Sequence, residues 1–124
     1  SVMKFKESKS IYLQIADRIC DEILQGKYKE EERIPSVREY ASTVEVNANT
    51  VVRSFDYLQG QDIIYNKRGL GYFVHTGARE RILELRKEVF LRDELPEFFR
   101  QIKTLDIPLK DVEMMYKEYL KELK

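Results

Sequence analysis

Two helix starts that lie close together in the first half of the chain constrain its fold more than any other feature. Ser36 and Glu39 have the spacing of a capping box, and Pro35 precedes them. Asn47, a residue type that caps helices well, marks the second start. Only residues 43–46 are left for the turn between the two predicted helices. This spacing predicts a helix-turn-helix, in which the first residues of the second helix enter the major groove of DNA.

A basic, glycine-containing turn over residues 66–71 follows the second of these helices. It lies between strand-like runs at 63–65 and 70–75, and this pattern predicts a β-hairpin. An earlier helix is expected over 11–24, where isoleucine recurs every four residues and forms a core-facing stripe. A hairpin directly behind a helix-turn-helix is the arrangement of a winged helix.

The last part of the chain is predicted to be helical and different in kind. We expect helices over 78–91, from 95–96 onward with Pro96 in the first turn, and over 108–124. Three short helices make a poor core by themselves, so a two-fold partner would bury their apolar stripes. The alternative is that they pack onto the winged helix of the same chain. The predicted dimer contacts are Ile82, Leu85, Val89, Val112, Met115, Tyr116, Tyr119 and Leu120.

These patterns predict a mostly α fold with a small β-hairpin. An N-terminal winged helix-turn-helix would occupy residues 1–77, and a short α-helical dimerisation domain would occupy residues 78–124.

The net charge of +0 argues mildly against a nucleic-acid-binding protein, because such domains are often basic overall. What matters for DNA is the local field, and the candidate contact elements carry Arg38, Arg53, Lys67 and Arg68. A neutral winged helix would also suit a protein–protein interaction module, which is the alternative function.

Nothing in the sequence indicates an enzyme, a metal site or another cofactor. Cys20 lies in a helical apolar stripe, where a small core residue is the usual role. His75 is the only histidine, so a site built from several histidines is excluded. A single cysteine fits a reducing cytoplasm. No apolar run approaches the ~20 residues of a membrane span, so no membrane partner is expected.

Each candidate DNA contact has a plainer explanation when it is considered alone. Arg38 can reach a guanine edge or form an exposed ion pair, and Asn47 can contact adenine or serve only as a cap. Lys67 and Arg68 can hold phosphates or form a solvated turn. Their occurrence together, in this order, favours DNA.

Residues 11–74 resemble the winged-helix domain of the GntR family of bacterial transcription regulators. Two departures stand out: residues 30–32 are glutamates where the family usually has Pro-Gly, and Asp62 stands where it usually has glycine. An aspartate tolerates the left-handed conformation that such a turn needs. The resemblance is carried by residues 11–16, 23–26, 34–39, 46–53 and 68–74.

The resemblance implies roles for the matched positions. Arg38 would read a base, the start of the second helix would hold phosphate or base, and Arg53 would lie near the DNA backbone. The wing would sit in or over the minor groove. The expected DNA-binding residues are Ser36, Arg38, Asn47, Asn49, Thr50, Arg53, Lys67, Arg68 and Gly69.

The short helical tail resembles that of the YtrA-type branch, in which the tail serves dimerisation and which is associated with ABC-transporter operons. The expected function is a repressor that binds a palindromic operator in double-stranded DNA as a homodimer. The sequence leaves open whether a small-molecule effector exists.

Overall fold

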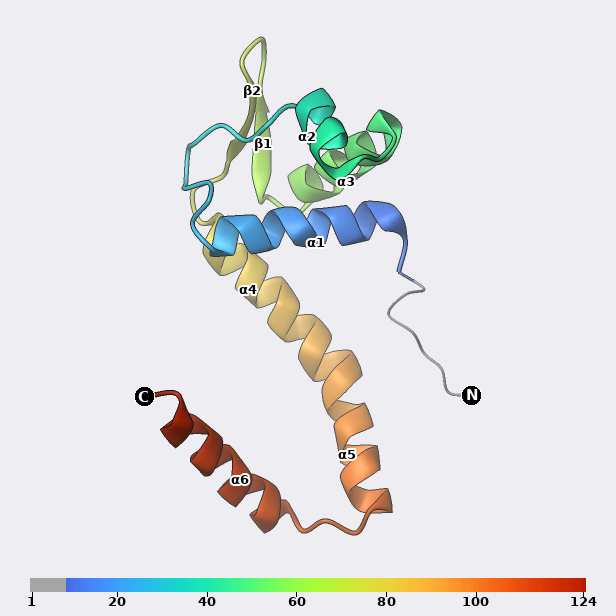
Figure 1. Cartoon of the computed structure of the whole chain (residues 1–124), viewed down its shortest axis with the longest axis vertical. Coiled ribbons are helices and arrows are strands. Elements are labelled where there is room, and N and C mark those ends of the chain that lie inside the picture. Colours follow the sequence, from blue (N-terminus) through green and yellow to red (C-terminus); the bar gives the residue numbers. More distant parts are fainter. Residues whose placement is uncertain (1–8) are drawn as a thin grey trace. The chain divides into compact units, whose positions relative to one another are not determined.

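The computed structural model describes residues 9–124, and its first part is a winged helix (Figure 1). The predicted fold class, mostly α with a small hairpin, is confirmed. The elements of the winged helix are α1 (Ile11–Leu24), α2 (Val37–Val44), α3 (Ala48–Gly60), β1 (Ile64–Lys67) and β2 (Gly71–Val74).

Helix α1 packs against α3 in the core of the winged helix. Its predicted stripe is buried, with Ile15, Ile19 and Ile23 each no more than 6% exposed. Ser10 stands at the predicted N-cap position, but its side chain makes no capping hydrogen bond. Gly26 follows the helix with φ +86°, the left-handed conformation that favours glycine after a helix.

The helix-turn-helix forms as the caps predict. At the start of α2, the Glu39 amide donates to the Ser36 hydroxyl at 3.1 Å, and the Ser36 amide donates to the Glu39 carboxylate at 2.8 Å. Glu45 ends α2 with φ 56°, and the chain then enters α3 at Asn47. The buried face of α3 packs on α1 and α2, and its core residues Val51, Phe55 and Leu58 are 0% exposed.

A buried carboxylate fixes α2 against α1. The Tyr40 hydroxyl donates to Glu22 at 3.2 Å, and both residues are buried. Arg18 donates to the other oxygen of Glu22 at 3.4 Å. Burial and the Glu22 charge raise the pKa of Tyr40 above its ordinary range, so the phenol keeps its donor proton. These contacts hold α2 in place through side chains far apart in the sequence.

The wing is a two-stranded antiparallel hairpin with a third segment along its edge. Strand β1 pairs with β2 in the register Ile64↔Val74 to Lys67↔Gly71. The loop before α2 lies on the other edge of β2, where Arg33 bridges Phe73. Lys67 belongs to the strand and not to the turn as predicted, because the turn closes tightly by a 2.8 Å hydrogen bond from the Leu70 amide to the Lys67 carbonyl.

The rest of the chain is helical. Its helices are α4 (Ala78–Val89), the π-helical turn η2 (Phe90–Glu94), α5 (Leu95–Thr104) and α6 (Leu109–Glu122). No helix within residues 9–124 has the length and apolar character needed to cross a membrane.

The predicted separation of the helices over 78–91 and from 95 onward is wrong, because the helix continues through η2 into α5. A proline inside a regular α-helix clashes with the carbonyl four residues earlier. For Pro96 that carbonyl belongs to Arg92, which lies in the wider π-helical turn. The local π geometry therefore lets the helix pass the proline without a break.

The chain forms two compact units, one ending at Glu84 and the other beginning at Leu85. The first turns of α4 belong to the winged-helix unit, because Ala78 and Ile82 are 0% and 1% exposed. Ile82 was expected at a dimer interface, but its side chain is already in the core. The functional boundary at residues 77–78 remains a prediction.

Candidate nucleic-acid interface

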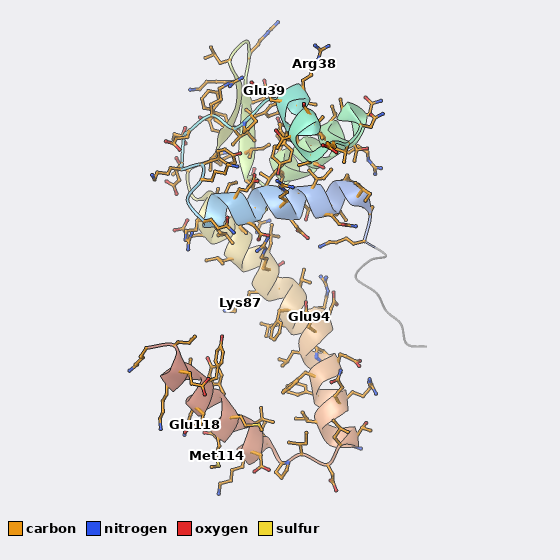
Figure 2. All side chains as sticks on the ribbon, in the orientation of Figure 1. Arg38, Glu39, Lys87, Glu94, Met114 and Glu118 are labelled. Carbon is orange, nitrogen blue, oxygen red and sulfur yellow. The ribbon has the colours of Figure 1, made fainter. Side chains whose placement is uncertain are left out.

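Arg38 projects from the first turn of α2, away from the body of the winged helix (Figure 2). The residue is exposed, and its guanidinium has no hydrogen bond or ion pair among residues 9–124. An exposed ion pair was the alternative explanation for this residue, and the structure shows none. All the donors of this guanidinium are therefore available for a partner outside the chain, as bidentate recognition of a guanine requires.

Two of the predicted DNA-binding residues already act as helix caps. Ser36 accepts from the Glu39 amide, and Asn47 accepts from the Asn49 amide at 2.7 Å. Any contact of Asn47 with DNA would therefore use its side-chain NH2 group. Asn49 is exposed and Thr50 is half-buried at the start of α3. Asn47, Asn49 and Thr50 therefore lie together at the start of α3.

Arg53 is held on the surface of α3 by an aromatic residue of α1. Its guanidinium carbon lies 4.1 Å from the centroid of the Tyr12 ring, which is a cation–π distance. The Ser54 hydroxyl donates to the Tyr12 carbonyl at 2.7 Å and ties the two helices together. Residue spacing does not predict this pairing, because Tyr12 and Arg53 belong to different helices.

The wing presents its cations on an ordered hairpin. The Lys67 ammonium lies 4.7 Å from the centroid of the Phe73 ring. Arg68 is exposed at the turn. Gly69 has φ +77°, as the third position of a type II turn requires, and a Cβ there would meet no atom within 4 Å. The backbone at Gly69 is therefore uncrowded, and the turn can approach another molecule closely.

The two departures from the family pattern both fall at positions of positive φ. Asp62 has φ 62°, so aspartate makes the turn expected of it. Glu31, in the loop where the family usually has Pro-Gly, has φ 67°. Its carboxylate accepts hydrogen bonds from the hydroxyls of Tyr65 and Thr76 and from the Thr76 amide, the last at 3.1 Å. The glutamate thus supplies bonds to the base of the wing that a glycine lacks.

The Glu31 bonds make the stability of the wing base dependent on pH. Hydrogen bonds from Thr76 and Tyr65 lower the pKa of Glu31 below its ordinary value of 4.5. A lowered pKa gives stability that is present above the ordinary value and lost as pH falls through the lowered one. We expect Glu31→Gln to reduce the thermal midpoint at neutral pH and to flatten its fall in acid, as followed by circular dichroism. Asp56→Asn, which removes an exposed carboxylate from the middle of α3, should leave the curve unchanged.

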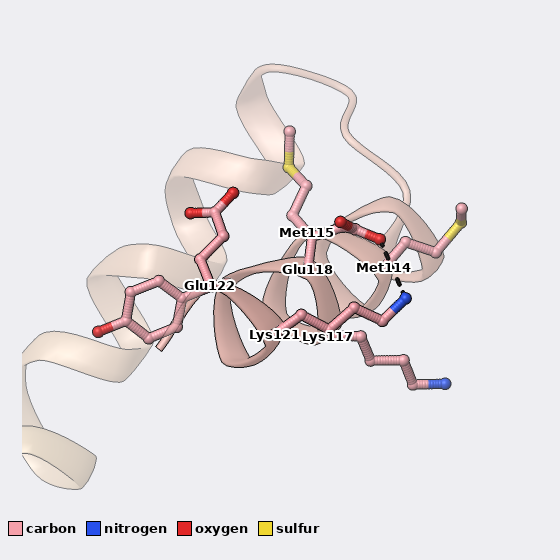
Figure 3. Close-up of a pocket in the computed structure, with 7 residues that line it drawn as sticks. Met114, Met115, Lys117, Glu118, Lys121 and Glu122 are labelled. Atoms are coloured by element: carbon pink, nitrogen blue, oxygen red, sulfur yellow. Dashed lines mark hydrogen bonds and ion pairs between the residues drawn. The ribbon is translucent and has the colours of Figure 1, made fainter. Parts of the chain in front are cut away.

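The second unit, Leu85–Lys124, has no buried residue, although every one of its residues is described. On α6, Met115 is 70% exposed and Tyr119 is 56% exposed. An open hollow of about 550 Å³ lies along this helix and is lined by α6 side chains alone (Figure 3). Glu118 and Lys121 also line this hollow and form an ion pair at 3.5 Å. The apolar stripe predicted for α6 is therefore present and uncovered within the chain.

Comparison with known proteins agrees with this geometry. The family model described as bacterial regulatory proteins, gntR family, matches residues 11–74. The chain is 33% identical to YhcF, an uncharacterized HTH-type transcriptional regulator of Bacillus subtilis, over 88% of each chain. It is 27% identical to the HTH-type transcriptional repressor YtrA of the same organism, over 96% of this chain and 91% of YtrA.

Solved structures show the same fold. A GntR-family chain from Bacteroides thetaiotaomicron is 59% identical, with a TM-score of 0.83 over 93% of this chain and 100% of that chain. The DNA-binding domain of AraR, solved in complex with its operator ORR3, is 27% identical. Its TM-score is 0.54, over 60% of this chain and 87% of that chain.

Proposed function

Since the chain belongs to the gntR family of bacterial regulatory proteins, we propose that it is a transcription repressor that binds an inverted-repeat operator as a homodimer. It is a transcription regulator with a winged-helix DNA-binding domain. To this family-level function the proposal adds that the DNA site is an inverted repeat, that the protein is a homodimer and that it represses transcription.

The observation that carries the proposal is the unpaired Arg38 guanidinium in the first turn of α2, the helix that precedes α3 in the helix-turn-helix. Arg38 and Asn49 are both exposed in the helix-turn-helix, where such a motif meets base edges. Lys67 and Arg68 add two cations on the wing. Together they combine groups that read bases with groups that hold phosphates, and specific DNA binding needs both.

The homodimer is supported by the uncovered second unit. A helical segment that buries none of its own residues needs a partner, and a second copy of the same segment is the partner always present. A two-fold dimer also presents two helix-turn-helix units to DNA, which matches an inverted repeat. The proposed interface consists of Leu85, Val89, Val112, Met115, Tyr116, Tyr119 and Leu120.

Repression and the kind of regulated gene are proposed from similarity. YtrA of Bacillus subtilis, which aligns over nearly the whole of this chain, is described as a repressor. The short helical tail resembles the YtrA-type branch, so we extend the proposal to control of a transporter operon. An operator that overlaps the promoter would let the bound dimer block transcription.

Selection from random duplexes tests the proposal directly. We expect rounds of binding to enrich an inverted repeat, and the same repeat to occur beside the encoding gene and a transporter operon. Deleting the gene should then raise transcription of that operon. A protein that shifts no duplex in the presence of competitor DNA would instead be an interaction module.

Removing the wing cations should weaken binding without changing sequence preference. We expect Lys67→Ala with Arg68→Ala to reduce affinity for selected and random duplexes alike, because phosphate contacts carry no sequence information. The slope of log affinity against log salt should flatten by about 0.9 for each lost contact. Fluorescence anisotropy over a salt series measures both quantities.

The control for the wing variant is Lys103→Ala with Lys110→Ala, which removes two exposed cations outside the winged helix. Its salt slope should match that of the unmodified protein. An unchanged slope in the wing variant itself would mean that the wing does not touch DNA.

A further inference from the structure

Arg33 lies across a glycine of the wing, although it comes from the loop before α2. Its Nε donates to the Leu70 carbonyl at 3.1 Å, at the end of the wing turn. The same Nε lies 2.9 Å from the position that a Cβ on Gly71 would take. A Cβ there would push the Arg33 side chain aside, and the φ of +113° at Gly71 also favours glycine.

The strand register puts Arg33 and Lys67 on the same face of the wing. Arg33 is opposite Phe73, and Lys67 is opposite Gly71, in antiparallel pairing. Side chains of directly opposed residues share a face, as do those of residues two apart in one strand. The ammonium of Lys67 does lie over the Phe73 ring. Arg33 and Lys67 therefore lie on one face of the wing together with Gly71, which has no side chain of its own.

Two carboxylates lie near this pair, and both are already bonded within the chain. The charge of Arg33 contributes to lowering the pKa of Glu39, but that carboxylate accepts from the Ser36 amide in the capping box. Glu31, which is near Lys67, accepts from Tyr65 and Thr76. Arg33 is exposed and forms no ion pair within residues 9–124. Its two terminal nitrogens make no hydrogen bond or ion pair within residues 9–124, and the bond of this side chain to Leu70 uses Nε.

We propose that Arg33 is a DNA-backbone contact of the wing, its guanidinium held across Gly71 so that it and Lys67 present two cations on one face. The proposal rests on DNA binding by the wing and adds a contact from outside the hairpin. The Nε bond to Leu70 fixes the orientation of the guanidinium, and its terminal nitrogens hold a phosphate oxygen, for which the planar fork is well suited.

The test compares Arg33→Gln, Arg33→Lys and a matched control, Lys87→Gln, on a selected duplex and a random one over a salt series. Lys87 is an exposed cation on α4, outside the helix-turn-helix and the wing (Figure 2). We expect Arg33→Gln to weaken binding to both duplexes roughly tenfold and to flatten the salt slope by about one unit. Arg33→Lys should retain the slope, because it keeps the charge. Lys87→Gln should behave as the unmodified protein.

Arg33→Gln combined with Lys67→Ala separates a direct contact from a merely structural role. Two independent phosphate contacts predict a slope about two units flatter than that of the unmodified protein. An Arg33→Gln variant with normal thermal stability and an unchanged slope would overturn the proposal, as would equal losses in Gln and Lys variants. If the unmodified protein binds no DNA at all, the proposed function is wrong. That result differs from the two outcomes above, in which the unmodified protein binds DNA and only the role of Arg33 is wrong.

Discussion

Replacing Tyr119 and Leu120 with glutamate is expected to turn the proposed homodimer into a monomer that still contains a folded winged helix. Both side chains lie on the uncovered stripe of α6, where they are 56% and 42% exposed in the single chain. Burying such a side chain is worth ~1.5–3 kcal/mol, and a two-fold axis counts each residue twice. The variant would instead put four carboxylates into the interface.

Sedimentation velocity measures the expected monomer, and anisotropy measures its effect on DNA. We expect a large loss of affinity for an inverted repeat and little change for a half-site, because the proposed base-reading residues lie in the other unit. Exchanging Glu118 and Lys121, as Glu118→Lys with Lys121→Glu, is the control. It keeps both charges of the pair and leaves every proposed interface residue unchanged, so the dimer should stay intact. A dimer that survives the glutamates would move the interface to Leu85 and Val89.

Replacing Arg38 with alanine is expected to cost about 1–3 kcal/mol of operator binding and to relax the preference at one base pair in each half-site. The reason is geometric: an exposed guanidinium with no partner among the described residues can bond both acceptors of a guanine edge. Anisotropy on a set of duplexes, each with one altered base pair, measures the loss at every position.

Arg38→Lys provides the matched variant, because it keeps the charge and loses the bidentate fork. We expect it to retain the salt slope and to lose most of the base preference. Equal losses by the alanine variant on every duplex would identify Arg38 as a phosphate contact. Full affinity in that variant would remove Arg38 from the interface.

The local parts of the fold could be predicted because their causes are local. Ser36 and Glu39 satisfy each other's amides within a single turn, and Asn47 caps α3 through a bond to Asn49. Gly69 supplies the positive φ of the wing turn. Each effect acts over a few residues, so the residue types and their spacing were enough to predict the helix-turn-helix and the hairpin.

The break predicted before Pro96 shows where local rules stop. Proline disfavours an α-helical continuation, yet the π-helical turn η2 removes the conflict, and propensity alone does not foretell this. Ile82 is a similar case. Its place on a helix stripe was predicted, but whether that stripe meets the same chain or a second copy depends on how α4 begins on the winged helix.

The sequence by itself determined the starts of α2 and α3, the wing turn and the apolar stripe of α6, because each follows from residue types a few positions apart. Only the tertiary structure decided that Arg33 lies over Gly71 and that Tyr12 supports Arg53. Arg33 bonds a carbonyl 37 positions away, and Tyr12 and Arg53 lie on different helices. The physical reason is that these contacts join separate elements of the fold. They depend on how α1 packs on α3 and on how the loop before α2 pairs with β2, and residue spacing does not predict either arrangement.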